Sequence, residues 1–340
     1  MRRNELAAAQ PGRPITRRTV ASWLLALGAG GALFGRPHVA LAQNWPSQPV
    51  RIVVPFGPGG GVDIVARTIA DEWVRQFGHS VVVENRAGAG GNIGSAAAAR
   101  AAPDGHTLLL ASNSNSYNDL LYSSAGYSPV RDLVPVIQIG RVPTVLVTTP
   151  TLQVSGLRDL VEQARARPGW LTFASFGFGS SGHLLFEMFT RRTGIQAVHV
   201  PYRNGQTYPD LIAGRIHAMF NNQLGVMSYI RSGQMRALGV ASERRSPQLP
   251  DLQTFAEQGI ADFNTDVWWG VTASAGTPPA TVARINGIVN SVLAAPAVRN
   301  RLEALGATPV GGEPAQFAAF FTAERATWQR VISEANIKID

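Results

Sequence analysis

The sequence of 340 residues contains no cysteine and a single lysine, Lys338. The absence of cysteine excludes disulfides, thiolate metal sites, cysteine nucleophiles and a lipidated N-terminal cysteine, although it does not fix the cellular compartment. Charged residues make up only 15% of the chain, below the usual quarter, and nearly all of the positive charge is arginine. We interpret the arginine excess as a codon bias of the genome rather than as a functional feature.

Catalytic patterns are also missing. The chain has no G-x-S-x-G nucleophile motif, and its six histidines show no H-x-x-x-H spacing. His183 and Glu187 form a helical i, i+4 pair, but no third metal ligand stands near them in the sequence. His199 and His217 fall inside predicted strands, and we interpret both as packing residues. The sequence therefore predicts no metal, no cofactor and no enzymatic activity.

The net charge of +8 comes mostly from the N-terminus. Residues 1–42 hold six arginines and one glutamate, so 24 basic and 21 acidic residues remain beyond them, a balance of +3. A nucleic-acid-binding protein usually carries a basic patch or stripe, and no basic run with interleaved aromatic residues follows residue 42. We therefore expect no nucleic-acid partner.

The first 42 residues have the pattern of a secretory signal peptide. Arg17 and Arg18 form a twin-arginine pair, an apolar run covers residues 20–34, and Ala40-Leu41-Ala42 is a small-x-small cleavage signal. The alternative is a membrane anchor, but an apolar run of this length is shorter than the roughly 20 residues that span a bilayer. The pattern predicts cleavage after Ala42, the twin-arginine export route and a periplasmic mature protein.

Two successive blocks of alternating strand-like and helical patterns follow the signal peptide, which indicates two α/β domains. Extended stretches near 141–149 and 235–242 are candidates for crossovers between the domains. We therefore predict two lobes with mainly parallel sheets joined by two extended crossovers, the first lobe formed by residues 43–142 and 243–340 and the second by residues 143–242. The predicted strands cover residues 50–56, 79–85, 106–112, 170–175, 196–202, 215–221 and 266–274, and three helical stretches end at Lys338.

Glycine-rich turns follow a strand in each block. In "VPFGPGGGVD", three consecutive glycines allow positive φ angles and a close approach of the backbone to a ligand, just before a predicted helix whose N-terminus favours an anion. Asp63 is either a helix-start residue or a polar contact in the site. "FGFGSSGH" repeats the pattern, and there Ser180 or Ser181 either caps the helix or binds a carboxylate.

Three further polar loops follow predicted strands: "SNSNS" (112–116), "VPYRNGQTYPD" (200–210) and "FNNQ" (220–223). Ligands of open α/β sheets bind beyond the carboxyl ends of the strands. The shared position of all five loops therefore predicts a ligand site between the two lobes, at a domain interface where such sites are common.

Five motifs follow one another between Trp45 and the C-terminus, in the order "WPSQPVRIVVPFGPGGGVDIVARTIADEW", "VENRAGAGGNIGSAAAARAAPDGHTLLLAS", "GFGSSGHLLFEMF", "VPYRNG" and "WWGVTASAGTP". The series resembles the substrate-binding proteins of tripartite tricarboxylate transporters, also called Bug receptors. The resemblance implies a two-lobed periplasmic-binding-protein fold, type II-like, with a hinge and a small organic acid bound in the cleft. It also implies a monomer that delivers its ligand to membrane permease subunits.

The resemblance further implies that the loop 56–63 holds the ligand carboxylate through backbone groups and ordered waters, and that loops 112–113, 177–183 and 202–207 complete the pocket. Together with the loop analysis, this gives one set of expected ligand-binding residues: Phe56, Gly57, Pro58, Gly59, Gly60, Gly61, Asp63, Ser112, Asn113, Phe178, Gly179, Ser180, Ser181, His183, Tyr202, Gln206, Thr207 and Asn221.

Several positions depart from the family's pattern. Phe178 stands where a small or polar residue is more common, Asn221 replaces a typical aspartate, and Ser274 replaces a common proline. The stretch after Tyr202 is one residue shorter than usual and lacks the usual small residues before Asp210. The additional aromatic ring at Phe178 motivates the hypothesis that the ligand is an aromatic or otherwise apolar carboxylate.

Two other functions stay open at the level of the sequence. An exported α/β hydrolase acting on a small ester would need a nucleophile and a base, and no such pair is visible. A receptor that signals to a membrane sensor would share every feature of a transport receptor.

Overall fold

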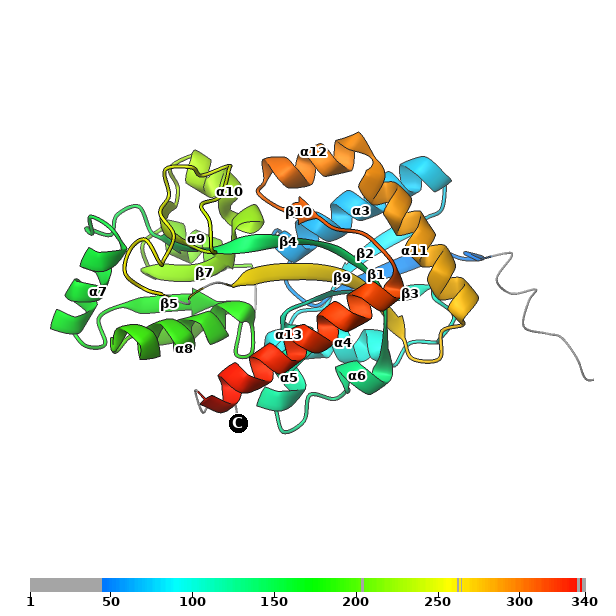
Figure 1. Ribbon diagram of the computed structural model, residues 1–340, viewed down its shortest axis with the longest axis horizontal. Coiled ribbons are helices and arrows are strands. Elements are labelled where there is room, and N and C mark those ends of the chain that lie inside the picture. Colours follow the sequence, from blue (N-terminus) through cyan, green and yellow to red (C-terminus); the bar gives the residue numbers. More distant parts are fainter. Residues whose placement is uncertain (1–44, 203–204, 262, 264, 335–336, 338–340) are drawn as a thin grey trace, which may run out of the picture. The chain divides into compact units, whose positions relative to one another are not determined.

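The computed structural model describes residues 45–202, 205–261, 263, 265–334 and 337. Residues 46–340 form one compact α/β unit (Figure 1). Its strands lie in a curled, mixed sheet in the order β2-β1-β3-β9-β4-β7-β5-β6, with β8 and β10 paired to β4. The predicted signal peptide and its cleavage site lie outside the described residues.

The first strand group consists of parallel strands that alternate with helices. β1 lies between β2 and β3, with Ile52 opposite Val83 and Leu108. The β-branched and leucine-rich sequences of these strands suit a buried parallel sheet. The elements of this group are β1 (Val50–Val54), α3 (Gly61–Phe77), β2 (Val81–Asn85), η1 (Ala89–Gly91), α4 (Asn92–Ala99) and β3 (Thr107–Ser112).

The long strand β4 (Leu133–Thr148) connects the two strand groups. Residues 133–143 of β4 pair antiparallel with β9 (Asp266–Ser274), while residues 144–148 pair antiparallel with both β7 and β8 (Arg236–Ala241). β10 (Thr308–Pro309) pairs with β4 at Gly140 and Arg141. Strands β4 and β9 run side by side through the middle of the ribbon (Figure 1). β4 is therefore shared by both groups.

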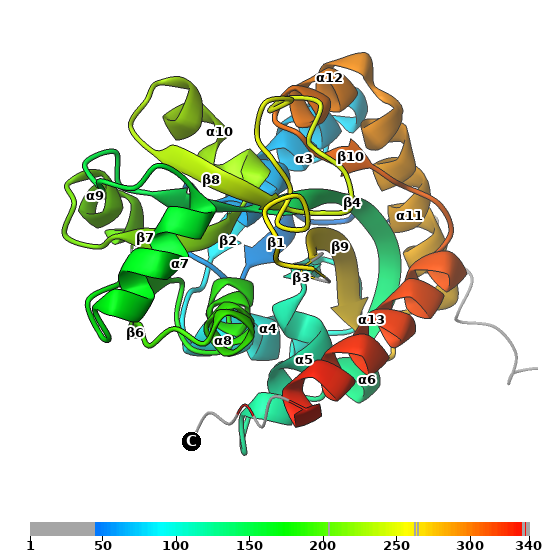
Figure 2. The same ribbon diagram turned by 60° about the vertical axis from the view of Figure 1, so that its left-hand side comes forward.

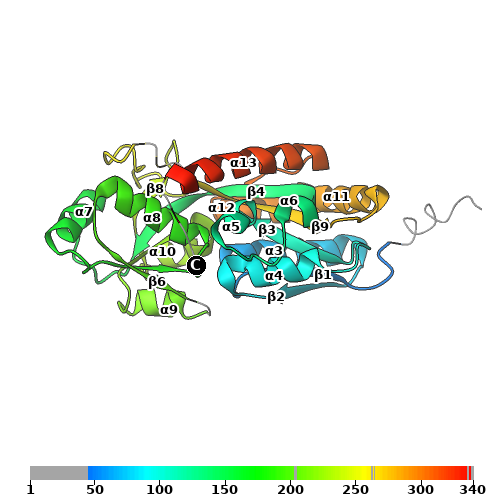
Figure 3. The same ribbon diagram turned by 90° about the horizontal axis from the view of Figure 1, so that it is seen from below.

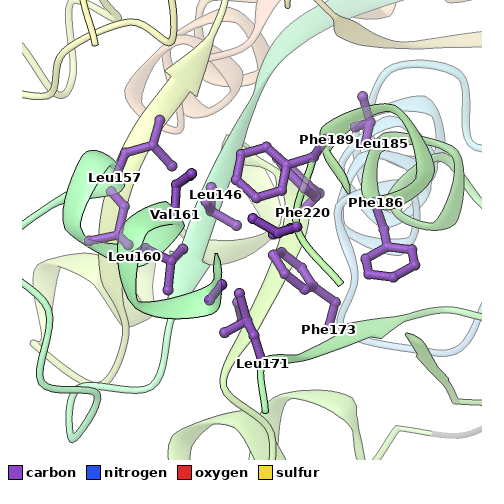
Figure 4. Packing of buried hydrophobic residues seen from close by; sticks show 14 of the residues in the cluster. Leu146, Leu157, Leu160, Val161, Leu171, Phe173, Leu185, Phe186, Phe189 and Phe220 are labelled. Atoms are coloured by element: carbon purple, nitrogen blue, oxygen red, sulfur yellow. The ribbon is translucent and has the colours of Figure 1, made fainter. Parts of the chain in front are cut away.

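The second strand group packs its helices around a phenylalanine-rich core. Phe173, Phe189 and Phe220 contact one another with ring centroids 5.5–5.8 Å apart. Figure 4 shows side chains of α7 and α8 converging on these rings from the two sides. The elements of this group are α7 (Leu157–Ala166), β5 (Thr172–Ser175), α8 (Ser181–Thr193), β6 (Val198–Pro201), α9 (Thr207–Ile212), β7 (Ala218–Asn222) and α10 (Gln223–Arg231).

The last helix, α13, crosses β4 and packs against α5, and Figure 2 shows it running beside β9. Both Arg325 guanidinium nitrogens, Nη1 and Nη2, bind the Asp119 carboxylate, at 2.6 and 2.9 Å, and Nη1 also donates to the Ser116 carbonyl. In Figure 3, α13 and α3 lie on opposite sides of β4. The remaining helices are α5 (Ser114–Leu121), α6 (Pro129–Asp132), α11 (Pro279–Ala294), α12 (Pro296–Ala304) and α13 (Pro314–Glu334).

Within the described part of the chain, no single helix has the length and apolar character of a membrane span. Only α11 and α12 taken together pass that test, as a pair bent by 69°.

The predicted α/β class is confirmed, and the outer strands are parallel as expected. The pairings of β4 are antiparallel, which residue patterns did not reveal because strand direction depends on distant partners. The extended stretch expected near 141–149 lies in the longer strand β4, and the stretch 112–116, expected to be a loop, starts helix α5 at Ser114. Trp268 and Trp269 of β9 are buried in the core. The division into two lobes at the stated boundaries stays a prediction.

Candidate ligand-binding site

The first glycine loop, residues 56–63, leads from β1 into α3. Gly59 adopts φ +82°, and a β-carbon at Gly57 or Gly59 would meet no atom within 4 Å. Gly60 stands at the N-cap position of α3 without a side-chain hydrogen bond to cap the helix. The first amides of α3 are therefore not satisfied by a capping side chain, and a helix start of this kind attracts an anion.

Asp63 holds the first glycine loop in shape. Its Oδ2 accepts hydrogen bonds from the Gly59 N–H and from Arg67 Nε, both at 3.0 Å, and its Oδ1 accepts one from Asn85 Nδ2 at 2.9 Å. Burial alone would raise the pKa of Asp63, but the hydrogen bonds from Arg67, Gly59 and Asn85 and the charge of Arg67 together lower it. The carboxylate is thus charged and bound within the loop, which agrees with its interpretation as a helix-start residue.

The first glycine loop touches the second strand group at Gly61. A β-carbon built on Gly61 would lie 2.1 Å from Asn222 Oδ1, and a β-carbon on Gly225 would lie 3.0 Å from the Gly61 nitrogen. Asn222 caps α10 by accepting from the Gly225 N–H at 2.8 Å. Only glycine therefore fits at position 61 in this arrangement.

The second glycine loop, residues 177–183, meets the turn 88–91 of the first strand group. Tyr122 Oη donates to the Phe178 carbonyl at 2.5 Å, and a β-carbon on Gly90 would lie 2.3 Å from that same oxygen. Gly179 fits against Asn118 and Tyr122 only because it lacks a side chain. The two strand groups thus contact each other at two glycine-rich places.

Ser180 and Ser181 stand at the start of α8. Ser180 occupies the N-cap position, but its hydroxyl donates to the Gly177 carbonyl at 2.7 Å instead of accepting from a helix amide. Ser181, the first residue of α8, is half-buried. The start of α8 therefore also lacks a side-chain cap, as the start of α3 does.

Phe178 and two imidazoles form an aromatic group beside the second glycine loop. The rings of His183 and His199 stack with centroids 4.4 Å apart, and Phe178, which is 47% exposed, meets both edge-on. Burial lowers the pKa of His183 to about 4, and burial together with the neighbouring His183 lowers that of His199 to about 3. Both rings are therefore neutral near neutral pH.

Other expected site residues are already engaged within the protein. Asn113 Nδ2 donates to the Asp266 carbonyl at 3.0 Å, and Asn113 Oδ1 accepts from the Trp268 N–H at 3.0 Å. Asn221 Nδ2 donates to Tyr208 Oη at 2.8 Å. Tyr202 Oη donates to Asp210 at 2.8 Å, and burial followed by this bond raises the pKa of Tyr202 to about 12.

The remaining expected residues differ in burial. Ser112 is buried, and its N–H donates to Asn115 Oδ1 at 2.9 Å. Thr207 is 1% exposed, and its hydroxyl has no hydrogen-bond partner among the described residues. Gln206 and Pro58 are exposed, while Phe56 is half-buried.

The structure adds residues that the sequence did not single out. Ser114 Oγ is buried without a described hydrogen-bond partner and would contact a β-carbon on Gly91 at 3.4 Å. Asn118 Oδ1 is buried without a partner in the described residues and lies beside Gly179. The run "GAGG" at 88–91, also glycine-rich and also before a helix, was the available signal for this third turn.

Backbone amides and neutral polar side chains dominate this region, and such a set can hold a carboxylate without a lysine. Across the described ranges, no group of three His, Asp or Glu side chains is arranged to hold a metal ion. Two strand groups that share β4 and meet at glycine turns beyond the strand ends define a solute-binding protein of the periplasmic-binding-protein type.

Comparison with known proteins identifies the family. A model described as the tripartite tricarboxylate transporter family receptor matches residues 65–337. The chain belongs to this family of periplasmic solute-binding receptors, as its motifs predicted.

Among curated relatives, protein BugT of Bordetella pertussis is 41% identical over 301 residues, covering 88% of this chain and 92% of BugT. Among solved structures, the periplasmic binding protein BugD shares 31% identity with a TM-score of 0.84, covering 86% of this chain and 99% of BugD. R. palustris Rpa4515, solved with adipate, shares 36% identity with a TM-score of 0.83 at the same coverage of both chains.

Proposed function

We propose that this protein captures a small carboxylate between its two strand groups and delivers it to the membrane subunits of a tripartite tricarboxylate-type transporter. The observation that carries the proposal is the first glycine loop, whose amides stand at the uncapped start of α3 and directly against Asn222 of the second strand group. A related receptor was solved with adipate, a dicarboxylate.

The carboxylate is held by main-chain N–H groups of Gly57, Gly60 and Gly61, since Pro58 has no N–H and the N–H of Gly59 is bonded to Asp63. Donors of this kind are fixed in place before the ligand arrives, so little conformational entropy is lost on binding. The charge of Asp63 is balanced by Arg67, and Asn85 donates a further hydrogen bond to it, which limits the repulsion between Asp63 and the acid. The wall of the site opposite the first glycine loop is formed by the second glycine loop together with Tyr202, Gln206, Thr207 and Asn221.

Ligand capture involves closure of two lobes with the boundaries given above, and the hinge is formed by the two crossovers near 141–149 and 235–242, which lie in β4 and β8. Glycines at 61, 90 and 179 are needed because the walls touch there. Closure around a ligand is a common hinge motion of such receptors.

The half-exposed ring of Phe178 favours an aromatic or otherwise apolar carboxylate over a short, polar one. The ring rests on two imidazoles that are neutral, so this wall offers the ligand apolar surface without an opposing charge. A panel of adipate, malonate, benzoate and phenylacetate, compared by calorimetry, tests this preference. Binding of malonate alone would refute it.

Substitutions at Gly60 test the use of backbone amides. Gly60 adopts φ −78°, close to the φ of proline, so Gly60→Pro removes one N–H without requiring a different φ at residue 60. Gly60→Ala keeps the N–H and meets only the loop's own Gly57 carbonyl at 3.9 Å. We expect Gly60→Pro to weaken binding of the best carboxylate at least about tenfold, the value of one charge-assisted hydrogen bond, and Gly60→Ala to bind normally. Equal affinities of the two variants would contradict the proposal.

The alternative of an exported hydrolase has one structural candidate, the pair Ser175 and His199, whose Oγ and Nε2 are 2.6 Å apart. Ser175 is fully buried, and His199 Nδ1 has no partner among the described residues to orient it. This arrangement differs from an activated nucleophile, which needs both access to substrate and a third group. We therefore infer a receptor without catalysis, and turnover of a small ester by the purified protein would disprove this.

Export to the periplasm with cleavage after Ala42 and a monomeric state complete the proposal. Mass spectrometry of the secreted protein checks the cleavage site, because a mature chain starting at Gln43 is expected. A sensor role remains the alternative to transport, and loss of solute uptake on deletion of the receptor would separate transport from sensing.

A further inference from the structure

One cavity of the protein is distinct from the candidate ligand-binding site. Its volume is about 700 Å³, within the roughly 300–1,000 Å³ of small-molecule sites. It is bordered by β4, the start of β9, the segment 242–247 and one face of α13. None of the residues expected to bind the carboxylate lines it.

The inner part of this cavity is aromatic and acidic. Trp268 and Trp328 are 1% and 5% exposed, and Trp328 Nε1 donates to Glu324 Oε1 at 2.5 Å. Glu324, which is half-buried, and Asp266, which is exposed at the start of β9, both line the cavity. Burial raises the pKa of Glu324, the hydrogen bond from Trp328 opposes this rise, and the charge of Asp266 adds to it. A positively charged group placed here would relieve the cost of burying the Glu324 carboxylate and would also face Asp266, and the indoles would add cation–π attraction.

The outer part of the cavity carries guanidinium groups. Arg141, Arg244 and Arg330 line it, are exposed, and form no ion pair with a described residue. Arg245 lines it too but is paired with Glu257 at 2.9 Å, and Glu243 is the acid on this side. A carboxylate at the mouth would therefore find free guanidinium donors.

We propose that this cavity is a second ligand site that takes a small zwitterion, a molecule with an ammonium group and a carboxylate. The ammonium group lies inside, next to Glu324, Asp266 and the indoles, and the carboxylate lies outside among the arginines. A simple anion is excluded from the inner part by the two carboxylates, and a simple cation is repelled at the mouth by the guanidinium groups.

The floor of the cavity is fixed from the side of the first site by Asn113. Its side chain binds the backbone of Asp266 and Trp268, and its Nδ2 lies 3.5 Å from Glu324 Oε1. This support keeps the floor in place without occupying the cavity.

Calorimetry and tryptophan fluorescence on the full mature protein test the proposal, with the standard α-amino acids and glycine betaine as probes. We expect at least one probe to bind, and its N-acetyl derivative or its amide, which lack one of the two charges, to bind at least about tenfold more weakly. Absence of binding by every probe, or equal binding of either derivative, would overturn the proposal.

Variants locate the binding. Glu324→Gln keeps an oxygen that can accept from Trp328, and Arg330→Ala alters an exposed helix position, so both should fold. Each of the two substitutions should weaken binding of the zwitterion at least about tenfold. Arg301→Ala, on an exposed part of α12 outside the cavity, should leave the affinity unchanged. Unchanged affinity in both Glu324→Gln and Arg330→Ala would place the ligand elsewhere and refute the proposal.

Discussion

The contact between Gly61 and Asn222 gives a prediction that distinguishes two possibilities: the two strand groups close around the ligand, or they form one rigid core. A β-carbon at position 61 would lie 2.1, 2.7 and 2.8 Å from Asn222 Oδ1, Cγ and Nδ2. Real β-carbons do not approach other atoms this closely, so Gly61→Ala requires the Asn222 side chain or the whole wall to move. If the two walls separate when no ligand is bound, only the liganded form is affected.

The magnitude follows from what Asn222 would lose. Its Oδ1 caps α10 at Gly225, a bond worth about 0.5–2 kcal/mol. Its Nδ2 donates to Asn221 Oδ1 at 3.0 Å, worth about 0.5–1.5 kcal/mol. The closed form therefore loses about 1–3.5 kcal/mol, which weakens binding about 5–400-fold. In the open form the substitution is neutral or favourable, because alanine is a better helix former than glycine by up to about 1 kcal/mol.

The assay combines calorimetry with the best carboxylate of the panel and thermal unfolding without ligand. Gly57→Ala is the matched control, since a β-carbon there meets nothing within 4 Å. Combining Gly61→Ala with Asn222→Ala in a double-mutant cycle should recover part of the affinity. Unchanged affinity of Gly61→Ala would refute the closure contact, and an equal loss of stability without ligand would show a fixed core instead.

Three further predictions concern stability. Asp63→Asn should lower the free energy of unfolding, measured in urea near neutral pH, by about 1–3 kcal/mol. Because folding lowers the pKa of Asp63, the stabilisation by its carboxylate is present above about pH 4 and is lost as the pH falls through the pKa of the folded state. His199→Gln should reduce the stability that the protein loses as the pH falls from about 6.5 to 3. In this range the imidazole of His199 binds a proton in the unfolded state, whereas the buried imidazole of the folded state stays neutral. Arg325→Met should lower the free energy of unfolding by about 1–3 kcal/mol through loss of the bidentate bond to Asp119.

Each of these has a distinct control. Asp71→Asn changes an exposed carboxylate on the same helix and should leave the unfolding curve unchanged. For His199→Gln the control is the wild-type protein measured over the same pH range. Asp119→Asn should cost no additional stability in the Arg325→Met background. A pH-independent effect of Asp63→Asn, or additive effects at Arg325 and Asp119, would contradict the assigned contacts.

The fold was predictable from the sequence where strand and helix patterns are local. The predicted strand at 50–56, the glycines that follow it and the helix predicted after them correspond to β1, a turn and α3. The antiparallel role of β4 was not predictable, because β4 pairs with residues 70 or more positions away in β7, β8 and β9. Sequence patterns define elements, whereas sheet order depends on contacts that no short window contains.

The candidate site shows a similar limit. The glycine turns and their position after strands could be predicted from the sequence, since glycine indicates a backbone that closely approaches other atoms. The partner of each glycine was not, so Asn222 opposite Gly61 and the turn 88–91 opposite Phe178 were missed. The orientation of Asn113 towards β9 also depends on tertiary packing alone.

A crystal structure with the best-binding carboxylate tests the central claim most directly. The account predicts that the ligand's acid group lies within hydrogen-bond distance of main-chain N–H groups of Gly57, Gly60 and Gly61, in the loop that leads into α3. A carboxylate bound away from this loop, or paired only with an arginine side chain, would contradict it.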